Sequence, residues 1–424
     1  MPGKVLIITY YWPPSGGAGV QRWLKFAKYL PSTGWIPVVL TVQPECAAYP
    51  FRDESLMDEI PVDVVVRRTR ATNYFFLYSK DQSKIPSGGF ANNPGKGFKN
   101  KISRFVRGNF FIPDPRKGWN RHAIKEASKI IREEEITHVI TTSPPHSTQL
   151  IGLKLKKKFP HIKWIADLRD SWTDIYYYDL FYPTVFSRAV DSHHEKSVIK
   201  SADKIITVGH NLAQIFSSKA ENVSSKFTVI PNGFDEEDLE GVDIVCPERF
   251  TITYVGTFSE IYPTEGFFRS ISQLERQGKD FVLRFVGSFP PETKEKINSL
   301  VSPDKTEFIS YTEHPNAIRL MASSSLLVII IPETKESQAI TPGKVFEYIA
   351  LQKPVLYIGP ANGDAAFHLR HCGYKGLFEP NDSENMLKFI LNVMGQNSPD
   401  QYYHHIEYSR RTLTNTLAGI LNSK

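Results

Sequence analysis

Short apolar runs, many of them rich in Val and Ile, recur along the whole 424-residue chain and constrain its fold more than any other feature. Longer segments with helix-like spacing separate these runs. Several runs are apolar on both faces, as expected for strands of a parallel sheet that helices cover on each side. The alternation predicts an α/β fold. We expect strands near residues 5–9, 38–42, 62–66, 138–141, 162–166, 204–208, 228–230, 251–255, 281–286, 307–310, 327–331, 355–358 and 376–378.

The strand–helix alternation runs through the chain twice. Residues 231–238 (PNGFDEED) separate the two series, as a turn that continues into an acidic stretch. Proline, asparagine and glycine mark turns, and a polar stretch with few apolar residues is typical of a domain boundary. We therefore predict two doubly wound, Rossmann-like domains at residues 1–240 and 241–400, followed by a C-terminal segment at 401–424.

The composition excludes several classes of protein. Apolar residues make up 41% of the chain and aromatic residues 12%, which is enough for large cores and rules out a disordered protein. The formal charge of +6 does not by itself indicate nucleic-acid binding, and the aromatic residues fall mostly in strand and helix patterns. The three widely spaced cysteines support neither a disulfide framework nor a zinc site, so we expect a reducing cytoplasm.

The first predicted strand leads into a glycine-rich turn at residues 13–19 (PPSGGAG) and then into a helix. Gly16 and Gly17 allow a ligand to approach the backbone, and the helix start offers free N–H groups with partial positive charge. A dinucleotide fingerprint needs one more glycine, but Arg22 stands in its place, which disfavours NAD. The alternative is a tight turn that only packs the helix, in which Arg22 lies away from the apolar face.

A second candidate ligand site lies at residues 341–348 (TPGKVFEY), where another helix is predicted to begin. Thr341 suits the N-cap, Gly343 leaves the amides approachable, and Lys344 adds positive charge. Glu347 follows one turn later on a similar face. Such a site can hold a nucleoside diphosphate, with amides and lysine on the phosphates and the carboxylate on the ribose. The alternative is a capped helix with a surface Lys–Glu pair.

Polar residues also follow several predicted strands, where open parallel sheets bind their ligands. His146 comes after the strand at 138–141, and Asp170 comes after the strand at 162–166. Gly256 and Thr257 follow the first strand of the second series. These positions make all four residues candidates for a site. The alternatives are a structural histidine and a salt bridge between Arg169 and Asp170.

The sequence patterns of several other chemistries are missing. No two aspartates stand two positions apart, so the Asp-x-Asp motif that holds a metal–diphosphate is not present in the sequence. Neither a P-loop, nor a His-Glu-x-x-His motif, nor a Gly-x-Ser-x-Gly elbow occurs. We therefore expect no metal site and no cofactor.

Taken together, the segments resemble the family 4 retaining glycosyltransferases of GT-B fold. The resemblance rests on residues 13–20, 169–172, 202–208, 230–235, 254–257 and 344–355, in that order, and extends over most of the chain. It implies two Rossmann-like domains that face each other across a cleft. The first would bind the acceptor and the second the nucleotide sugar. It also implies that the segment 401–424 forms a helix that crosses back to the first domain.

The resemblance further implies roles for individual residues. Glu347 would hold the ribose, Lys344 and Gly256 would meet the diphosphate, and Gly17 would close on it. His146 and Asp170 would face the transferred sugar or the acceptor. The catalytic candidates are therefore His146, Asp170 and Lys344, and the binding candidates are Gly16, Gly17, Gly256, Thr257, Gly343, Lys344 and Glu347.

The implied activity is metal-independent transfer of a sugar from a nucleotide-diphosphate sugar to a hydroxyl acceptor, a glycan or lipid-linked glycan, with retention of configuration. Lys344 and helix amides would stabilise the departing diphosphate. One departure concerns the donor sugar, because the family usually has a glutamate eight residues before Glu347, where this chain has Ala339 with Glu336 nearby. A nucleotide-sugar epimerase of the same fold and a non-catalytic nucleotide- or glycan-binding homologue remain as alternatives.

Residues 96–107 combine a basic and an apolar pattern. They carry no acidic residue, and their basic residues are Lys96, Lys99, Lys101, Arg104 and Arg107. Interleaved apolar side chains predict an amphipathic segment of the kind that docks on an anionic membrane surface. We expect a cytoplasmic protein that docks on the inner face of the cytoplasmic membrane through Lys99, Lys101, Arg104 and Arg107. The alternative is a solvated charged face.

Overall fold

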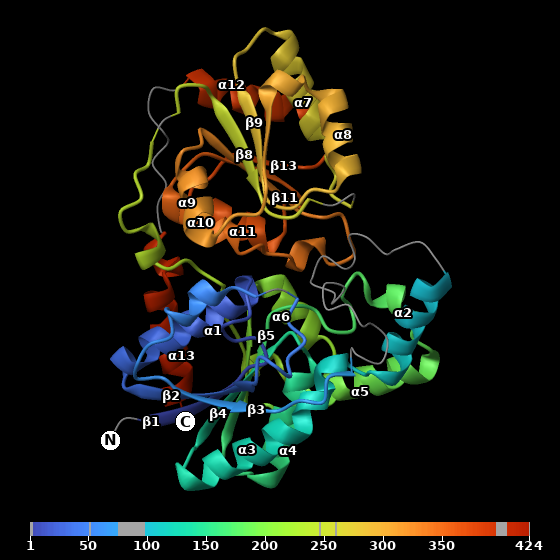
Figure 1. Ribbon diagram of the computed structural model, residues 1–424, viewed down its shortest axis with the longest axis vertical. Coiled ribbons are helices and arrows are strands. Elements are labelled where there is room, and N and C mark those ends of the chain that lie inside the picture. Colours follow the sequence, from blue (N-terminus) through green and yellow to red (C-terminus); the bar gives the residue numbers. More distant parts are fainter. Residues whose placement is uncertain are drawn as a thin grey trace. The chain divides into compact units, whose positions relative to one another are not determined.

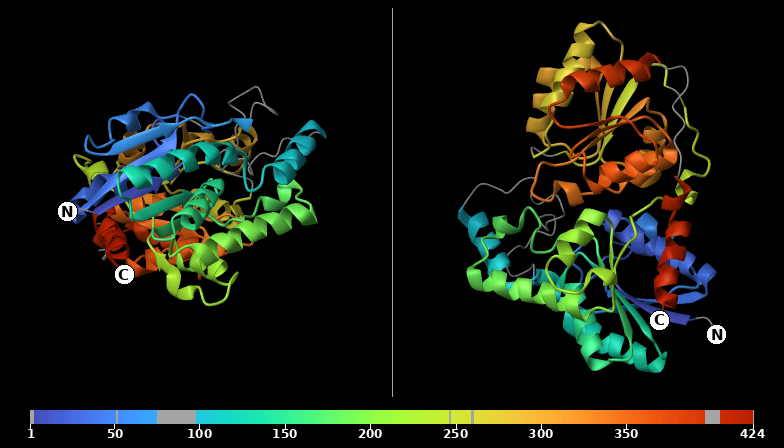
Figure 2. Two further views of the ribbon diagram at one scale, coloured as in Figure 1. Left: turned by 90° about the horizontal axis from the view of Figure 1, so that it is seen from below. Right: turned by 180° about the vertical axis from the view of Figure 1, so that it is seen from behind.

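The computed structural model describes residues 3–50, 52–74, 98–245, 247–258, 261–395 and 405–423. The chain divides into two compact units, of which the first combines Met1–Asn232 with Arg410–Lys424 and the second is Gly233–Ser409. The division after Asn232 lies within the predicted turn and before the expected residue 240. Figures 1 and 2 show that each unit is a parallel sheet with helices on both faces. This confirms the predicted α/β architecture.

The first unit is built on a seven-stranded sheet in the order β3-β2-β1-β4-β5-β6-β7. Every neighbouring pair is parallel, so all carboxyl ends meet at one edge of the sheet. The strand order reverses beside β1, and this is the place where doubly wound sheets bind ligands. The strands are β1 (Gly3–Ile8), β2 (Trp35–Val42), β3 (Val65–Thr69), β4 (His138–Ser143), β5 (Lys163–Leu168), β6 (Lys204–Thr207) and β7 (Phe227–Val229).

Seven α-helices are described in the first unit, and two of them define its core. The predicted apolar face of the first helix, which includes Val20, Trp23 and Leu24, lies in the main hydrophobic cluster. The C-terminal helix contributes Leu413 and Leu417 to the same cluster. The helices are α1 (Ala18–Tyr29), α2 (Phe98–Phe110), α3 (Asn120–Glu133), α4 (Ser147–Lys158), α5 (Val185–Ser201), α6 (His210–Ser217) and α13 (Arg410–Asn422).

The second unit repeats the plan with six parallel strands in the order β10-β9-β8-β11-β12-β13. Its strands are β8 (Thr251–Val255), β9 (Val282–Val286), β10 (Thr306–Ile309), β11 (Leu326–Ile330), β12 (Val355–Ile358) and β13 (Leu377–Phe378). Its described helices are α7 (Glu265–Arg276), α8 (Pro291–Leu300), α9 (His314–Ala322), α10 (Lys344–Leu351), α11 (Asp364–His371) and α12 (Ser383–Gly395). Two apolar clusters, one on each face of the sheet, form its core.

Each predicted strand is present, most of them within one or two residues of the expected position. The largest shift is at β3, which begins at Val65 rather than near Val62. Val62 is fully exposed, and the Val64 amide donates to the Pro61 carbonyl in a turn that delays the strand. In the part of the chain that the structure describes, every helix is too short or too polar to cross a membrane.

Candidate active site

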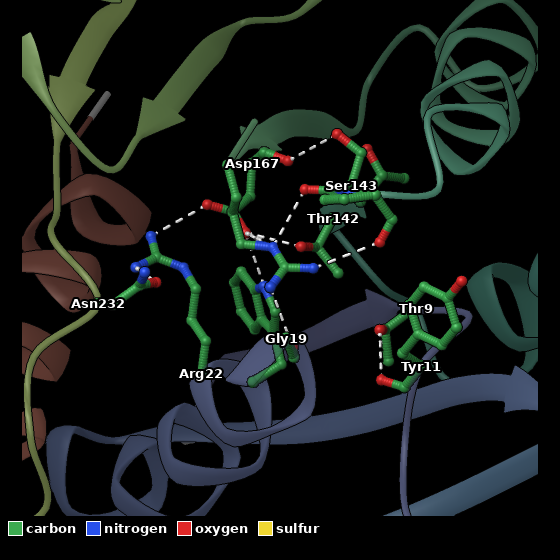
Figure 3. Close-up of polar contacts among 12 residues, drawn as sticks. Thr9, Tyr11, Gly19, Arg22, Thr142, Ser143, Asp167 and Asn232 are labelled. Carbon is green, nitrogen blue, oxygen red and sulfur yellow. Dashed lines mark hydrogen bonds and ion pairs between the residues drawn. The ribbon is translucent and has the colours of Figure 1, made fainter. Parts of the chain in front are cut away.

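In the first unit, the carboxyl ends of β4 and β5 are joined to α1 by one buried carboxylate (Figure 3). Asp167 accepts hydrogen bonds from Trp23 Nε1 (2.7 Å) and Thr142 Oγ1 (2.7 Å). It also pairs with Arg22 at 3.0 Å, and both of these side chains are fully buried. Because the partners come from α1, β4 and β5, Asp167 fixes the helix that follows the glycine-rich turn against the sheet.

Arg22 is therefore fully buried, although it lies away from the predicted apolar face of the helix. Arg22 Nη1 donates to the Pro231 carbonyl at 2.8 Å. Arg22, which stands where a dinucleotide fingerprint has its third glycine, therefore links α1 to the segment that follows β7. Lys25 is also buried and pairs with Glu59 at 2.8 Å. A buried guanidinium of this kind needs both a carboxylate and a carbonyl partner. We therefore assign a structural role to Arg22.

The glycine-rich turn itself is held from the side by Arg169. The Arg169 guanidinium donates to the carbonyls of Ser143 (3.0 Å), Pro144 (3.3 Å) and Gly19 (3.0 Å), as Figure 3 shows in part. A Cβ at Gly19 would lie 3.1 Å from this guanidinium. Arg169 thus sets the position of the turn relative to the end of β4, a role that the expected Arg169–Asp170 salt bridge did not include.

Gly17 occupies the N-cap of α1 with a φ of 101°, a conformation that favours glycine. It makes no side-chain cap, and its carbonyl accepts from the Val20 amide. Gly16 precedes it in the same turn and is half-buried. The turn consequently presents backbone rather than side chains at the carboxyl end of β1, as the sequence predicted for a close ligand approach.

His146 stands at the N-terminus of α4, where its imidazole is enclosed. Its ring stacks on Trp172 with centroids 4.8 Å apart, and Nε2 lies 3.2 Å from the Ser171 carbonyl, to which it donates. Nδ1 is buried without a hydrogen-bond partner among the described residues. Burial lowers the pKa of His146 to about 4, although Asp114 opposes the shift. The imidazole is therefore neutral at pH 7 and is a weak base, because burial disfavours its protonated form.

Asp170 and its neighbours lie beside His146 at the end of β5. The Asp170 side chain is exposed to solvent, so it remains open to a substrate. Below it, Trp172 Nε1 donates to Asp191 at 2.8 Å and Tyr178 donates to the same carboxylate at 2.9 Å. Burial raises the pKa of Asp191 to about 6. The structure therefore places His146 and Asp170, the two predicted catalytic residues of this unit, on adjacent loops. Trp172 stacks on His146 and donates to the buried Asp191.

In the second unit, two glycines meet at the carboxyl ends of β8 and β9. Gly256 and Gly287 have φ angles of 130° and 133°, which only glycine adopts readily. A Cβ at Gly287 would lie 2.3 Å from the Gly256 carbonyl, and the Gly256 amide donates to Val286 at 2.8 Å. Thr257 follows with an exposed side chain, and its carbonyl accepts from Tyr254. The two loops can approach each other this closely because both positions are glycine.

Lys344, the first residue of α10, reaches the Gly256 loop. Its Nζ donates to the Val255 carbonyl at 2.8 Å and lies 3.8 Å from the centroid of the Tyr254 ring. A Cβ at Gly256 would lie 3.6 Å from this nitrogen. Burial lowers the pKa of Lys344 to about 7, and Glu347 opposes the shift. An amine in this state gains its proton readily when an anion arrives.

The start of α10 differs in detail from the sequence prediction. The helix begins at Lys344 with Gly343 at the N-cap, and it has no side-chain cap, so the expected cap by Thr341 was wrong. The Thr341 hydroxyl is instead buried without a hydrogen-bond partner among the described residues. The first backbone hydrogen bonds are donated by Val345 and Phe346. The uncapped amides of the helix start remain available to an anion.

Glu347 is half-buried, and its partner is a residue that the sequence did not single out. Its carboxylate lies 2.9 Å from His314 Nε2, and His314 Nδ1 lies 3.9 Å from Asp238. Lys344 and Glu347 therefore have other partners and do not form the surface pair that was the alternative. His314 is the first residue of α9, so its ring fixes the Glu347 carboxylate from a neighbouring helix. A lone histidine 33 residues away gives no periodic signal in the sequence.

Ala339 stands at the position where the family usually has a glutamate. Ala339 ends a short 3-10 helix, Ser337–Ala339, and its side chain is buried. Glu336, the nearby acidic residue, is also buried. Ser337 Oγ holds this segment by donating to Pro332 and accepting from the Thr334 amide, both at 2.7 Å. The acidic side chain of this segment nearest to Ala339 in the sequence is therefore Glu336, three residues before it.

Comparisons with known proteins show what the sequence and the fold of this chain are similar to. The model of Glycosyltransferase Family 4 matches residues 86–238, which lie almost entirely in the first unit. No curated protein sequence matches the chain significantly. A structure of the lipopolysaccharide outer core galactosyltransferase WaaB in its apo form is similar over 99% of this chain and 100% of that chain, with a TM-score of 0.60 and 12% identity.

Two further solved structures show the same two-unit plan. Sucrose-phosphate synthase from Thermosynechococcus elongatus is similar over 98% of this chain and 93% of that chain, with a TM-score of 0.57 and 14% identity. A putative UDP-N-acetylglucosamine 2-epimerase from Listeria monocytogenes is similar over 99% and 96%, with a TM-score of 0.54 and 11% identity. The chain thus has the GT-B fold. Residues 86–238 are similar to Glycosyltransferase Family 4.

Proposed function

We propose that this protein transfers a sugar from a nucleotide-diphosphate sugar to a hydroxyl acceptor, with retention of configuration. The observation that carries the proposal is the cluster at the start of α10. There the uncapped helix amides, the Lys344 amine and the Gly256 and Gly287 loops converge at the carboxyl end of β8. These groups fit a diphosphate in charge.

Lys344 is the residue proposed to assist departure of the diphosphate. During transfer the bond between the sugar C1 and the phosphate oxygen breaks, and its electron pair remains on the diphosphate. The acceptor oxygen bonds to C1, and its proton passes to the departing diphosphate oxygen. The negative charge that develops on the leaving group is stabilised by an ammonium at Lys344 and by helix amides. Gly343 and Thr257 flank this position and would contact the phosphates through their backbones.

We assign acceptor binding to the first unit, at the loops that carry His146 and Asp170. Its support is the resemblance together with the exposed Asp170 carboxylate. Because the His146 imidazole is neutral and enclosed, its proposed role is to position the loop that carries Asp170, through the Ser171 carbonyl. Asp170 would accept a hydrogen bond from a sugar hydroxyl.

An epimerase is the second candidate, and the similarity to the Listeria structure favours it. An epimerase converts the nucleotide sugar without an acceptor, whereas a transferase releases nucleoside diphosphate in proportion to acceptor. We would incubate the protein with UDP-, GDP-, ADP- and CDP-hexoses, with and without a glycan mixture, and analyse both the sugar and the nucleotide. Acceptor-dependent release of diphosphate supports transfer. A changed sugar still attached to its nucleotide would establish the epimerase.

Replacement of Glu347 by Gln should weaken nucleotide binding about tenfold, which corresponds to about 1.4 kcal/mol. The carboxylate is proposed to accept from the ribose hydroxyls while His314 holds it in place. The free energy of unfolding should fall by only about 1 kcal/mol, the cost of one weakened hydrogen bond. Calorimetric titration with the preferred nucleoside diphosphate measures the effect. Glu292→Gln, in the first turn of α8, is the matched control, and equal affinity in both variants would exclude Glu347 from the site.

Activity should persist in EDTA. The described residues include no group of three or more His, Cys, Asp or Glu side chains arranged to hold a metal ion, and the proposed diphosphate site uses Lys344 and amides. We would measure the initial rate after dialysis against chelator and again after addition of Mg²⁺ or Mn²⁺. A rate that vanishes in chelator and returns with the metal would show that a cation, and not Lys344, neutralises the diphosphate.

A further inference from the structure

Helix α2 presents its apolar side chains to solvent and its arginines to the protein. Ile102, Phe105 and Phe110 are exposed, whereas Arg104 is buried. The guanidinium of Arg104 lies 5.5 Å from the Tyr182 ring, and that of Arg107 lies 3.9 Å from the Phe181 ring. The expectation that Arg104 and Arg107 face a membrane was therefore wrong. Lys96 lies outside the described residues, as does the side chain of Lys99.

Helix α2 is fixed in this orientation against the short 3-10 helix Tyr178–Phe181 and the start of α5. Asn109 donates to the Tyr182 carbonyl at 3.0 Å and accepts from the Thr184 amide at 2.7 Å. It also accepts from Ser187 Oγ at 2.8 Å. Gly108 permits the close approach, because a Cβ there would lie 2.3 Å from the Phe181 carbonyl. Figures 1 and 2 show α2 beside the start of α5, at the periphery of the first unit.

This packing creates one exposed apolar surface from two elements. Val185 and Phe186, in the first turn of α5, are 86% and 75% exposed, and Phe110 at the end of α2 is 66% exposed. Soluble proteins seldom expose several large apolar side chains together unless the surface binds something. We call this surface the α2–α5 patch. Its members are Ile102, Phe105, Phe110, Tyr182, Val185 and Phe186.

The charges around the α2–α5 patch indicate which kind of partner it binds. Helix α2 contains no acidic residue, and Lys101 is exposed beside Ile102. Arg188 and Asp179 are exposed and pair with each other, so they add no net charge. Two copies of the chain that joined through this patch would bring the same cations together, which disfavours a two-fold dimer. An apolar surface with a cationic flank instead matches the interface of an anionic lipid bilayer.

We propose that the α2–α5 patch inserts into the headgroup layer of an anionic membrane, with Val185, Phe186 and Phe110 as the inserted side chains. The proposal does not depend on the catalytic function. Lys101 contributes electrostatic attraction, while the buried arginines brace the helix through Phe181 and Tyr182. Of the four basic residues that the sequence indicated, Arg104 is buried and Arg107 half-buried, because periodicity shows that a helix has two faces but not which face is covered.

The test is co-sedimentation of the full chain with phosphatidylcholine vesicles, with and without 40% phosphatidylglycerol, at low salt. We expect binding to the anionic vesicles, and a reduction of at least tenfold in the partition coefficient for Val185→Ser/Phe186→Ser. Both side chains are mostly exposed, so this variant should keep the melting temperature of the wild type. Lys101→Gln should weaken binding at low salt and have less effect at high salt.

Val62→Ser, at a fully exposed valine in the same unit, and Lys125→Gln, at an exposed lysine of α3, are the matched controls and should bind as the wild type does. The proposal fails if anionic vesicles do not bind the protein at low salt. It also fails if the double variant binds them unchanged. Sedimentation velocity provides a third outcome: a wild-type dimer that the double variant converts to a monomer, without vesicle binding, would assign the patch to a second copy.

Discussion

Replacement of Asp167 by Ala should destabilise the first unit by about 3–5 kcal/mol, the usual cost of removing one partner of a buried ion pair. The variant leaves the Arg22 guanidinium uncompensated and removes the acceptor for Trp23 and Thr142. Urea unfolding followed by tryptophan fluorescence measures the change. Two transitions are expected from two units, and only the transition of the first unit should move.

Two variants make the Asp167 result specific. Asp280→Ala breaks a solvent-exposed pair with Arg249 and should leave the unfolding midpoint unchanged. Arg22→Met/Asp167→Leu removes both charges and should recover more than half of the lost stability, because no unpaired charge remains buried. An Asp167→Ala protein as stable as the wild type would show that this ion pair does not hold α1 to the sheet.

Replacement of Lys344 by Met should reduce nucleoside diphosphate affinity at least 100-fold, which corresponds to about 2.7 kcal/mol. Methionine has a similar length but provides neither charge nor a hydrogen-bond donor for the phosphates. The folded state should tolerate it, because the buried amine beside Tyr254 is replaced by an apolar group. Calorimetric titration measures the affinity, with Lys296→Met on the exposed face of α8 as the control. Equal affinity for wild type and Lys344→Met would contradict the proposed site.

In the wild type, the contribution of Lys344 to stability depends on pH, and the Lys344→Met variant should lack this dependence. Burial lowers the pKa of Lys344 to about 7, so above pH 7 the unfolded chain holds a proton at this residue that the folded protein has lost. Unfolding free energy attributable to Lys344 therefore rises as pH increases from 7 towards the ordinary lysine pKa, and this rise should be missing in Lys344→Met. A bound diphosphate raises the pKa, so wild-type binding at pH 8 should take up a proton. Titration in two buffers of different ionisation enthalpy detects this uptake.

The strands of this fold could be predicted from the sequence because most are buried on both faces and have short apolar runs. Residues 251–255 and 355–358 were placed without error, since glycine or proline lies beside each of these runs. β3 was misplaced because Val62 and Val64–Val66 form one apolar run, although a turn at Pro61 keeps Val62 in solvent. Apolar pattern alone does not distinguish a strand from the turn before it.

The candidate site was predictable where it depends on local geometry. Gly256 follows a strand and Lys344 starts a helix, so both could be placed from their neighbours in the sequence. His314 and Arg22 were missed because their partners, Glu347 and Asp167, are far away in the chain. The packing of Arg104 and Arg107 against the protein was missed for a similar reason. Stacking on Phe181 and Tyr182 determines which side is covered, and no pattern within the helix encodes that contact.

The central claim is that the start of α10 binds the diphosphate of a nucleotide sugar. The most direct test is a thermal shift measurement with UDP, GDP, ADP and CDP, on the wild type and on Lys344→Met. A ligand at a hundred times its dissociation constant should add about 2.7 kcal/mol to the stability of the wild type. We predict that at least one of the four raises the melting temperature of the wild type and has little effect on the variant. If none of the four shifts the wild type, or if both proteins shift equally, the claim is contradicted.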